Sequence, residues 1–339
     1  MRPRFLLLFL MICLSVAAHA QNEEGKIHLS METRADYQRD YYDGRAEKDE
    51  CGFKGKYLNL RMYGKISDRL SYDFNQRLNK MHSSASFFDA TDWLYVDYQA
   101  TDRWMLSAGK LVIGVGGYEY DAAPIDLYFC SEFWNVASCY AWGAALTYHF
   151  SPSDKLMAQV CESPFRSHYR HADMYAYNLM WYGSHGRWNA LWSMNMMEWA
   201  EHRYIHYISL GNEFHMADGL KLQLDVMNRA ASGQAFFLRD CSVIGELSYC
   251  PAQKWRLLAK ASYDVNHADK AADLCVMPGT ELTRVGAGVE YFPLDRKDLR
   301  LHAYYCRSWG TNTNPDGIMQ DNEDRAGIGL TWRIHILKR

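Results

Sequence analysis

The chain has 339 residues, and its 37 basic and 40 acidic side chains give a formal net charge of −3. This balance argues against a nucleic-acid-binding protein, which usually carries a basic footprint, so no nucleic-acid partner is expected. Aromatic residues make up 14% of the chain and charged residues 23%, a combination that fits strands with only one apolar side.

Residues 1–20 have the features of a secretory signal peptide. Two arginines precede an apolar run at residues 5–17, and the small-x-small cleavage site Ala18-His19-Ala20 follows it. The alternative is a transmembrane anchor, but a spanning helix needs roughly 20 apolar residues. We therefore expect cleavage after Ala20, which leaves residues 21–339 as one domain with 35 basic and 40 acidic side chains and a net charge of −5.

The remaining chain repeats one pattern, in which about ten residues alternate between apolar and polar side chains. In residues 220–226, for example, every even position is apolar and every odd position is polar. Such segments are typical of strands that present one side to lipid and the other to a lumen. The pattern predicts sixteen strands, at residues 27–41, 55–66, 70–80, 92–101, 104–114, 139–151, 155–163, 173–183, 187–199, 203–216, 219–229, 240–250, 255–265, 283–293, 298–308 and 324–336.

The connections between these predicted strands alternate in length. Those after even-numbered strands are short and rich in Asp, Gly, Pro and Ser, whereas most of those after odd-numbered strands are longer, such as 115–138 and 266–282. Aromatic residues flank the short turns, as at the membrane interface of outer-membrane barrels. We therefore predict an all-β, transmembrane antiparallel β-barrel of about sixteen strands, with a soluble β-sandwich or propeller as the alternative.

Eight cysteines remain once Cys13 leaves with the signal peptide, and none forms a C-x-x-C pair. The sequence therefore shows no zinc or redox motif, although an exported chain permits disulfides. Cys130 and Cys139 are the candidate disulfide, because both lie in or beside one long loop. The alternative is that they are free thiols.

Several segments resemble the phosphate-selective porin O and P family, in the form seen in Bacteroides-type bacteria. They are Ala108-Gly109-Lys110, the stretch from Gly116 to Tyr120, and Ala123-Pro124-Ile125-Asp126, together with the similar start at 31–37 and end at 327–333. The resemblance spans most of the chain after the signal peptide. It implies a sixteen-stranded barrel, usually trimeric, with the long third loop folded inward and an anion path lined by arginines and lysines.

The predicted third loop departs from that anion path. Residues 115–138 contain four acidic residues and no lysine or arginine. Because lining charge sets pore selectivity, an acidic constriction should favour cations or neutral solutes over phosphate. Our hypothesis is that Glu119, Asp121 and Asp126 narrow and charge the pore; the alternative is a loop that caps the rim. The predicted constriction residues are Tyr118, Glu119, Tyr120, Asp121, Asp126 and Glu132.

Because alternate residues of a strand face opposite sides, their positions predict which basic side chains lie on the lumen wall. Lys110 is added because it is the family-matched basic residue nearest the third loop. The alternative for each is a solvated wall residue held in an ion pair. The predicted pore-lining residues are Arg61, Lys65, Arg77, Lys110, Lys260, Arg284, Arg300 and Arg333.

The predicted function is a porin in the outer membrane of a Gram-negative cell, where a water-filled channel lets small hydrophilic solutes or ions diffuse passively. The alternative is a binding or adhesion barrel plugged by its loops. The expected partners are outer-membrane lipid, the solutes and two further copies in a homotrimer. We predict no enzyme, catalytic residue, cofactor or metal site, and we attribute the proximity of His168, His171 and Asp173 to chance.

Overall fold

A computed structural model describes residues 26–81, 86–166, 173–234, 236–315 and 317–338. The predicted signal peptide lies outside these residues. None of the helices in the described ranges is long and apolar enough to cross a membrane.

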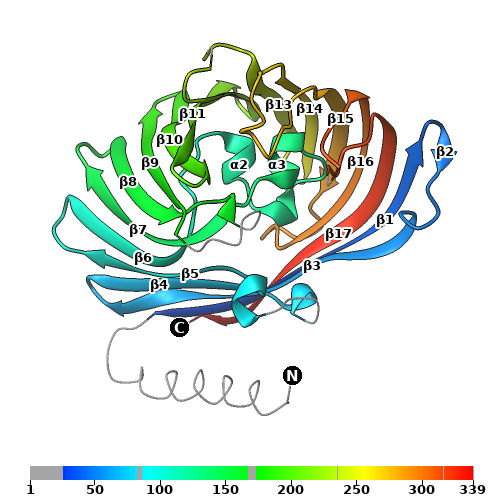
Figure 1. Ribbon diagram of the computed structural model, residues 1–339. Helices are drawn as coiled ribbons and strands as arrows, with labels where there is room; N and C mark the ends of the chain where they lie inside the picture. The colour runs from blue at the N-terminus through cyan, green and yellow to red at the C-terminus, as the bar shows by residue number, and fades with distance from the viewer. Residues whose placement is uncertain (1–25, 82–85, 167–172, 235, 316, 339) are drawn as a thin grey trace.

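Sixteen long strands form one antiparallel barrel, which closes because β1 pairs with both β17 and β3 (Figure 1). All sixteen predicted strands are confirmed, with ends that differ from the prediction by at most three residues. The strands are β1 Ile27–Tyr42, β3 Gly52–Ser67, β4 Leu70–Arg77, β5 Thr91–Gln99, β6 Trp104–Val112, β7 Tyr140–His149, β8 Asp154–Glu162, β9 Tyr175–His185, β10 Trp188–Ala200, β11 Arg203–Ala217, β12 Leu220–Ala231, β13 Asp240–Ala252, β14 Trp255–Asn266, β15 Glu281–Tyr291, β16 Leu299–Thr311 and β17 Asn322–Lys338. A further two-residue strand, β2 (Arg45–Ala46), pairs antiparallel with the end of β1.

The few helices lie in the connections between strands. They are η1 Leu78–Lys80, η2 Phe87–Ala90, α2 Tyr118–Asp121, η3 Pro124–Asp126 and α3 Glu132–Val136. Figure 1 shows α2 and α3 inside the ring of strands rather than on its rim.

The burial pattern of the wall is the reverse of that in a soluble protein. In β14, Trp255 and Leu257 are each 44% exposed on the outer face, whereas Lys260 and Ser262 are buried on the inner face. The same alternation runs along most strands, as expected for a barrel with lipid outside and polar groups inside. Exposed apolar residues of the outer face include Val96, Leu106, Leu146, Leu156, Val160, Leu179, Leu224, Leu247, Leu301 and Leu330.

Aromatic side chains gather beside the short turns, as predicted. The rings of Trp104 and Tyr148 are 4.5 Å apart and those of Trp255 and Tyr291 are 4.8 Å apart. Such girdles mark the level where the wall leaves the hydrocarbon.

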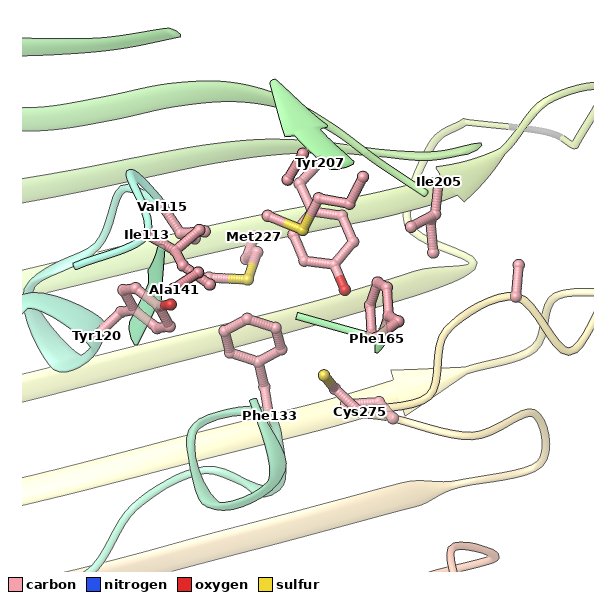
Figure 2. Close-up of a cluster of buried hydrophobic side chains, with 14 of the residues drawn as sticks. Ile113, Val115, Tyr120, Phe133, Ala141, Phe165, Ile205, Tyr207, Met227 and Cys275 are labelled. Carbon is pink, nitrogen blue, oxygen red and sulfur yellow. The ribbon is translucent and has the colours of Figure 1, made fainter. Parts of the chain in front are cut away.

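Part of the barrel interior is filled by an apolar core (Figure 2). Phe133 of α3 and Phe165 of the loop after β8 pack with Tyr207 of β11 and Met227 of β12. Cys275, from the loop between β14 and β15, completes this part of the core. These loop residues therefore fold inward and narrow the lumen on one side.

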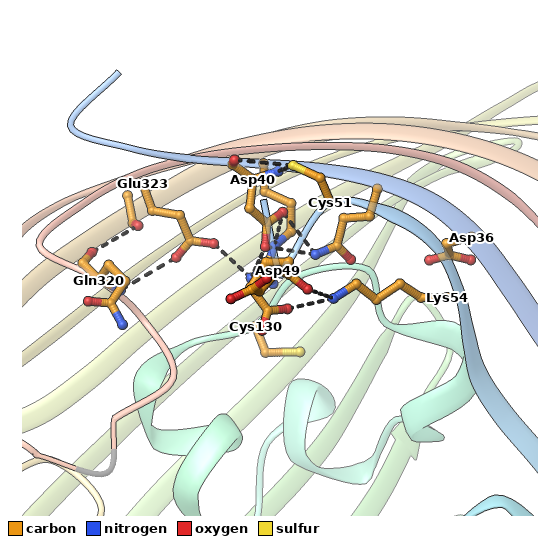
Figure 3. A network of polar contacts seen from close by, with 12 residues as sticks. Asp36, Asp40, Asp49, Cys51, Lys54, Cys130, Gln320 and Glu323 are labelled. Atoms are coloured by element: carbon orange, nitrogen blue, oxygen red, sulfur yellow. Dashed lines mark hydrogen bonds and ion pairs between the residues drawn. The ribbon is translucent and has the colours of Figure 1, made fainter. Parts of the chain in front are cut away.

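A polar network fixes the seam where the first and last strands meet (Figure 3). Arg325 of β17 binds Asp40 of β1 at 3.0 Å and Glu323 at 2.9 Å. Because the three side chains lie on two adjoining strands, the network holds the closed register.

Leu247 tests which face meets lipid. It is 43% exposed in the middle of β13, opposite Leu222 and Ala259. Leu247→Arg should lower the free energy of unfolding by about 2–4 kcal/mol, the cost of arginine near the bilayer midplane. Urea unfolding in lipid vesicles measures this change, and Leu247→Met is the apolar control. If Leu247→Arg lowered the free energy of unfolding no more than Leu247→Met does, this face would not meet lipid.

Candidate pore constriction

The third loop joins β6 to β7 over residues 113–139 and runs inside the barrel, as predicted. Its first residues lie flat on the inner wall. Gly114 N–H donates to Gln159 Oε1, and Gly116 N–H to Ser193 Oγ, each at 2.8 Å. A Cβ on Gly116 would lie 2.5 Å from the carbonyl oxygen of Leu191, so only glycine allows this close approach.

Carboxylates of the wall then hold the two α-helices of the loop. Asp225 of β12 accepts the N–H groups of Tyr118 and Glu119 at 2.9 and 2.8 Å, at the start of α2. Asp264 of β14 accepts the N–H of Glu132 at 2.8 Å, at the start of α3. These three bonds satisfy backbone donors that a helix start leaves unpaired.

The tip of the loop is held by three arginines of the opposite wall. Arg34 of β1 donates to Leu127 O at 2.5 Å, while Arg300 of β16 and Arg333 of β17 bind Asp126 at 3.0 and 2.8 Å. Burial opposes ionisation of Asp126, but the charges of these last two arginines hold its pKa below the ordinary value. The loop is thus fixed at both sides of the barrel.

The structure divides the six predicted constriction residues. Tyr118 and Asp121 face the lumen, and Asp126 lies there in its arginine clamp. Glu119 borders the lumen, but its carboxylate is buried against Lys260 at 2.7 Å.

For two of the six residues, the prediction that they line the constriction is wrong. Tyr120 packs in the apolar core, and its hydroxyl donates to Ser138 O. Glu132 is fully buried and accepts the N–H of Met319, so it joins two loops instead of facing solute. The reason is that a helical turn of four residues, as in α2, directs side chains to opposite sides.

The structure also divides the predicted pore-lining residues, into those with some exposure and those that the third loop or the wall buries. Arg61 is about one-third exposed beside Asp73, Lys65 is exposed near a turn, Arg333 is partly exposed, and Arg77 is mostly buried beside Asp92. Their part in conduction stays a prediction.

Other basic residues on that list serve to anchor the loop. Lys260 and Arg300 are buried in ion pairs with loop residues. Arg284 is 2% exposed, donates to Cys130 O and binds Glu323, so a lumen-facing role for it is wrong.

Lys110, which was predicted from the family resemblance, does not line the pore. It lies opposite Leu94 and Trp142, whose side chains belong to the outer face, and its ammonium donates to the carbonyl oxygens of Phe88 and Thr91. Lys110 therefore ties η2 to the outside of the wall and does not line the lumen.

The predicted Cys130–Cys139 disulfide is wrong, because both thiols are free. Cys130 lies near Lys260 and Glu119, whereas Cys139 lies near Tyr120 and its Sγ donates to Ala137 O. The helix α3 separates the two residues and turns them to different parts of the interior. Burial raises the pKa of the Cys139 thiol to about 11. Of the histidines near Asp173, His168 and His171 lie outside the described residues.

Two cavities flank the loop inside the barrel. The first cavity has about 260 Å³ and lies between α2 and strands β12–β14; the second cavity has about 230 Å³ and lies toward strands β5–β9. Asp121 lines both. Burial raises the pKa of Asp121, and the charge of Lys155 partly offsets this rise. The other charged lining residues are Glu119, Asp126, Lys221, Asp225, Glu246, Arg256 and Lys260 in the first cavity and Asp97 and Lys155 in the second.

Lys155, Tyr95 and Tyr182 line the second cavity and were not predicted from the sequence. A signal was present in β8, where Lys155 has the parity of the inward Gln159 and not of the outward Leu156. Nothing in the sequence shows that the three side chains meet across strands.

This geometry agrees with comparisons to known proteins. The family model described as phosphate-selective porin O and P matches residues 27–235, which is more than half of the chain. The chain belongs to this porin family. It is therefore an outer-membrane channel for small solutes, and the alternative of a loop-plugged binding barrel is not favoured. Family and fold indicate a channel rather than an enzyme.

Solved structures share the fold of this porin at low sequence identity. An anion-selective porin from Comamonas acidovorans has a TM-score of 0.65 at 11% identity, over 92% of this chain and 100% of that one. OmpT of Vibrio cholerae has a TM-score of 0.62 at 14% identity, over 92% of this chain and 99% of that one. The channel DcaP of Acinetobacter baumannii has a TM-score of 0.61 at 13% identity, over 91% of this chain and 97% of that one. A search of curated proteins found no match.

Proposed function

We propose that this porin is a passive channel whose narrow zone favours small cations and neutral polar solutes over anions such as phosphate. The observation that carries the proposal is Asp121, a carboxylate that faces both cavities and has no ion-pair partner within 4 Å among the described residues. Across the two cavities, six acidic and four basic residues give a lining charge of −2.

Ion pairing explains why the arginines of the wall do not reverse this sign. Arg300 and Arg333 are neutralised by Asp126 and neighbouring acids, and Arg256 binds Glu290 at 2.7 Å. A passing ion therefore meets paired arginines, and among the described lining residues the unpaired acids Asp97, Asp121 and Asp225 outnumber the one unpaired base, Lys155. Lining charge in a narrow zone sets ion preference, so this arrangement supports cations.

Removing the charge of Asp121 should reduce cation preference. A unit charge about 6 Å from an ion in water contributes roughly 0.7 kcal/mol, attractive for K⁺ and repulsive for Cl⁻, so Asp121→Asn should lower the K⁺/Cl⁻ permeability ratio about tenfold. Reversal potentials in planar bilayers under a KCl gradient measure the ratio. Glu201→Gln, in the turn between β10 and β11, is the control and should change nothing. An anion-selective wild type, or an unchanged ratio in Asp121→Asn, would contradict the proposal.

Acidification should remove the same preference. Since burial raises the pKa of Asp121, it takes up a proton at a higher pH than an ordinary aspartate, whose pKa is about 3.9. Cation selectivity should therefore decline as the pH falls toward 4. Asp126, with its lowered pKa, stays ionised over that range. Reversal potentials between pH 7 and pH 4 should show a step in the wild type that Asp121→Asn lacks; the same step in both proteins would assign it to another group.

We also propose that the chain is exported by a signal peptide cleaved after Ala20, sits in the outer membrane of a Gram-negative, Bacteroides-type cell and assembles as a homotrimer. The apolar outer face supports contact with lipid or with further copies. One solved structure of OmpT is described as a trimer form, and that protein shares the fold.

A further inference from the structure

The second cavity is lined by residues of two chemical kinds. Apolar side chains come from Met105 of β6, Met157 of β8 and Met180 of β9, together with Leu111 and Ile113. Tyrosines and charged groups also line the cavity. Methionine side chains adapt their shape to a ligand, so these residues offer a deformable apolar surface.

The charged groups of this cavity are of opposite sign and are held apart. Lys155 lies over the ring of Tyr182, with Nζ 4.2 Å from its centroid. Asp97 accepts the hydroxyl of Ser107 at 2.5 Å, and Asp121 approaches from the third loop. Within the described parts of the chain, none of these three charges forms an ion pair closer than 4 Å. A ligand with two charges can therefore bridge them.

We propose that the second cavity binds a small zwitterion with an apolar side chain, such as a free α-amino acid, during its passage. Its carboxylate would bind Lys155, its ammonium group would lie between Asp97 and Asp121, and its side chain would contact the methionines. The inference rests on the proposed channel function, because the ligand reaches the cavity through the lumen. The inference adds small zwitterions to the cations and neutral solutes that the channel is proposed to favour.

The charge balance disfavours simpler ligands. An inorganic anion beside Lys155 is repelled by the carboxylates of Asp97 and Asp121. A simple cation beside these carboxylates is repelled by the ammonium group of Lys155. A zwitterion satisfies both signs and replaces the water lost on entry with charge-assisted bonds. The volume of about 230 Å³ exceeds a cavity of about 150 Å³ that holds benzene, so an amino acid with a linear side chain fits.

Current block in planar bilayers tests this proposal. With KCl carrying the current through single wild-type channels, L-methionine should reduce the mean current in a saturable manner. Hexanoate, hexylamine and glucose lack one or both charges and should need at least about tenfold higher concentration for the same reduction. Lys155→Met should weaken the effect of L-methionine by a similar factor, and Lys48→Met, in the exposed connection between β2 and β3, should not.

Each result decides between named alternatives. Equal potency of hexanoate or hexylamine would reduce the cavity to a simple charge site and overturn the proposal, as would equal potency of glucose or an unchanged response in Lys155→Met. Should Lys155→Met fail to assemble, the comparison of the four solutes on the wild type still decides. A wild type that carries no KCl current would instead contradict the channel function itself.

Discussion

Arg229→Met should lower the free energy of unfolding by about 3–5 kcal/mol, because it leaves two carboxylates buried without a counter-charge. Arg229 of β12 is fully buried, and its Nε lies 2.8 Å from Asp240 and 2.7 Å from Asp273. It also donates to Ser242 Oγ at 2.9 Å and lies over the ring of Phe133. One guanidinium thus joins the wall, the loop between β14 and β15, and the third loop.

A nearby exposed pair provides the control for Arg229. Arg239 and Asp269 are 3.9 Å apart, and their side chains are 55% and 89% exposed. Exposed pairs contribute little, so Arg239→Met should leave unfolding almost unchanged. Urea unfolding of both variants in vesicles, followed by tryptophan fluorescence, measures the difference. Equal small losses would mean that the Arg229 network is not a stabilising element.

The strands could be predicted from the sequence because lipid imposes a strict rule on them. A slip of one residue would place lysines in hydrocarbon, so the pattern of β12, with Leu222 and Leu224 against Lys221, fixes both the face and the register. The lengths of the connections then distinguish the two ends of the barrel. Each of these constraints involves residues that are close together in the sequence, and they recur in strand after strand.

The roles of the inward residues could not be predicted in the same way. Parity shows that Lys260 and Arg284 point inward, but not that the third loop covers them. Whether a charge meets water or a loop depends on contacts between residues more than 100 positions apart, such as Lys260 and Glu119. The prediction for Lys110 is wrong for a different reason: it came from the family resemblance, whereas the register with Leu94 and Trp142 places the side chain on the outer face.

Lys260→Met should both destabilise the protein and loosen the third loop. Its ammonium lies 2.7 Å from Glu119 Oε1, and both side chains are only 4% exposed. Ser131 also donates to Glu119, through its backbone N–H at 3.0 Å and through its hydroxyl. Removing the ammonium leaves a buried carboxylate, so we expect a loss of about 3–5 kcal/mol. We also expect larger fluctuations of the single-channel current, since α2 carries Asp121.

The double variant Glu119→Gln with Lys260→Met separates charge from packing. It removes both charges and keeps the acceptor for Ser131, so most of the lost stability should return and the current should become quiet again. Unfolding in vesicles and single-channel recording together measure this recovery. If the double variant is no better than Lys260→Met, the lysine acts through its packed aliphatic chain and the ion pair does not hold the loop. If stability and a quiet current return, charge neutralisation within the barrel holds the loop, and Asp121 remains as the exposed acid that the third loop presents to a solute.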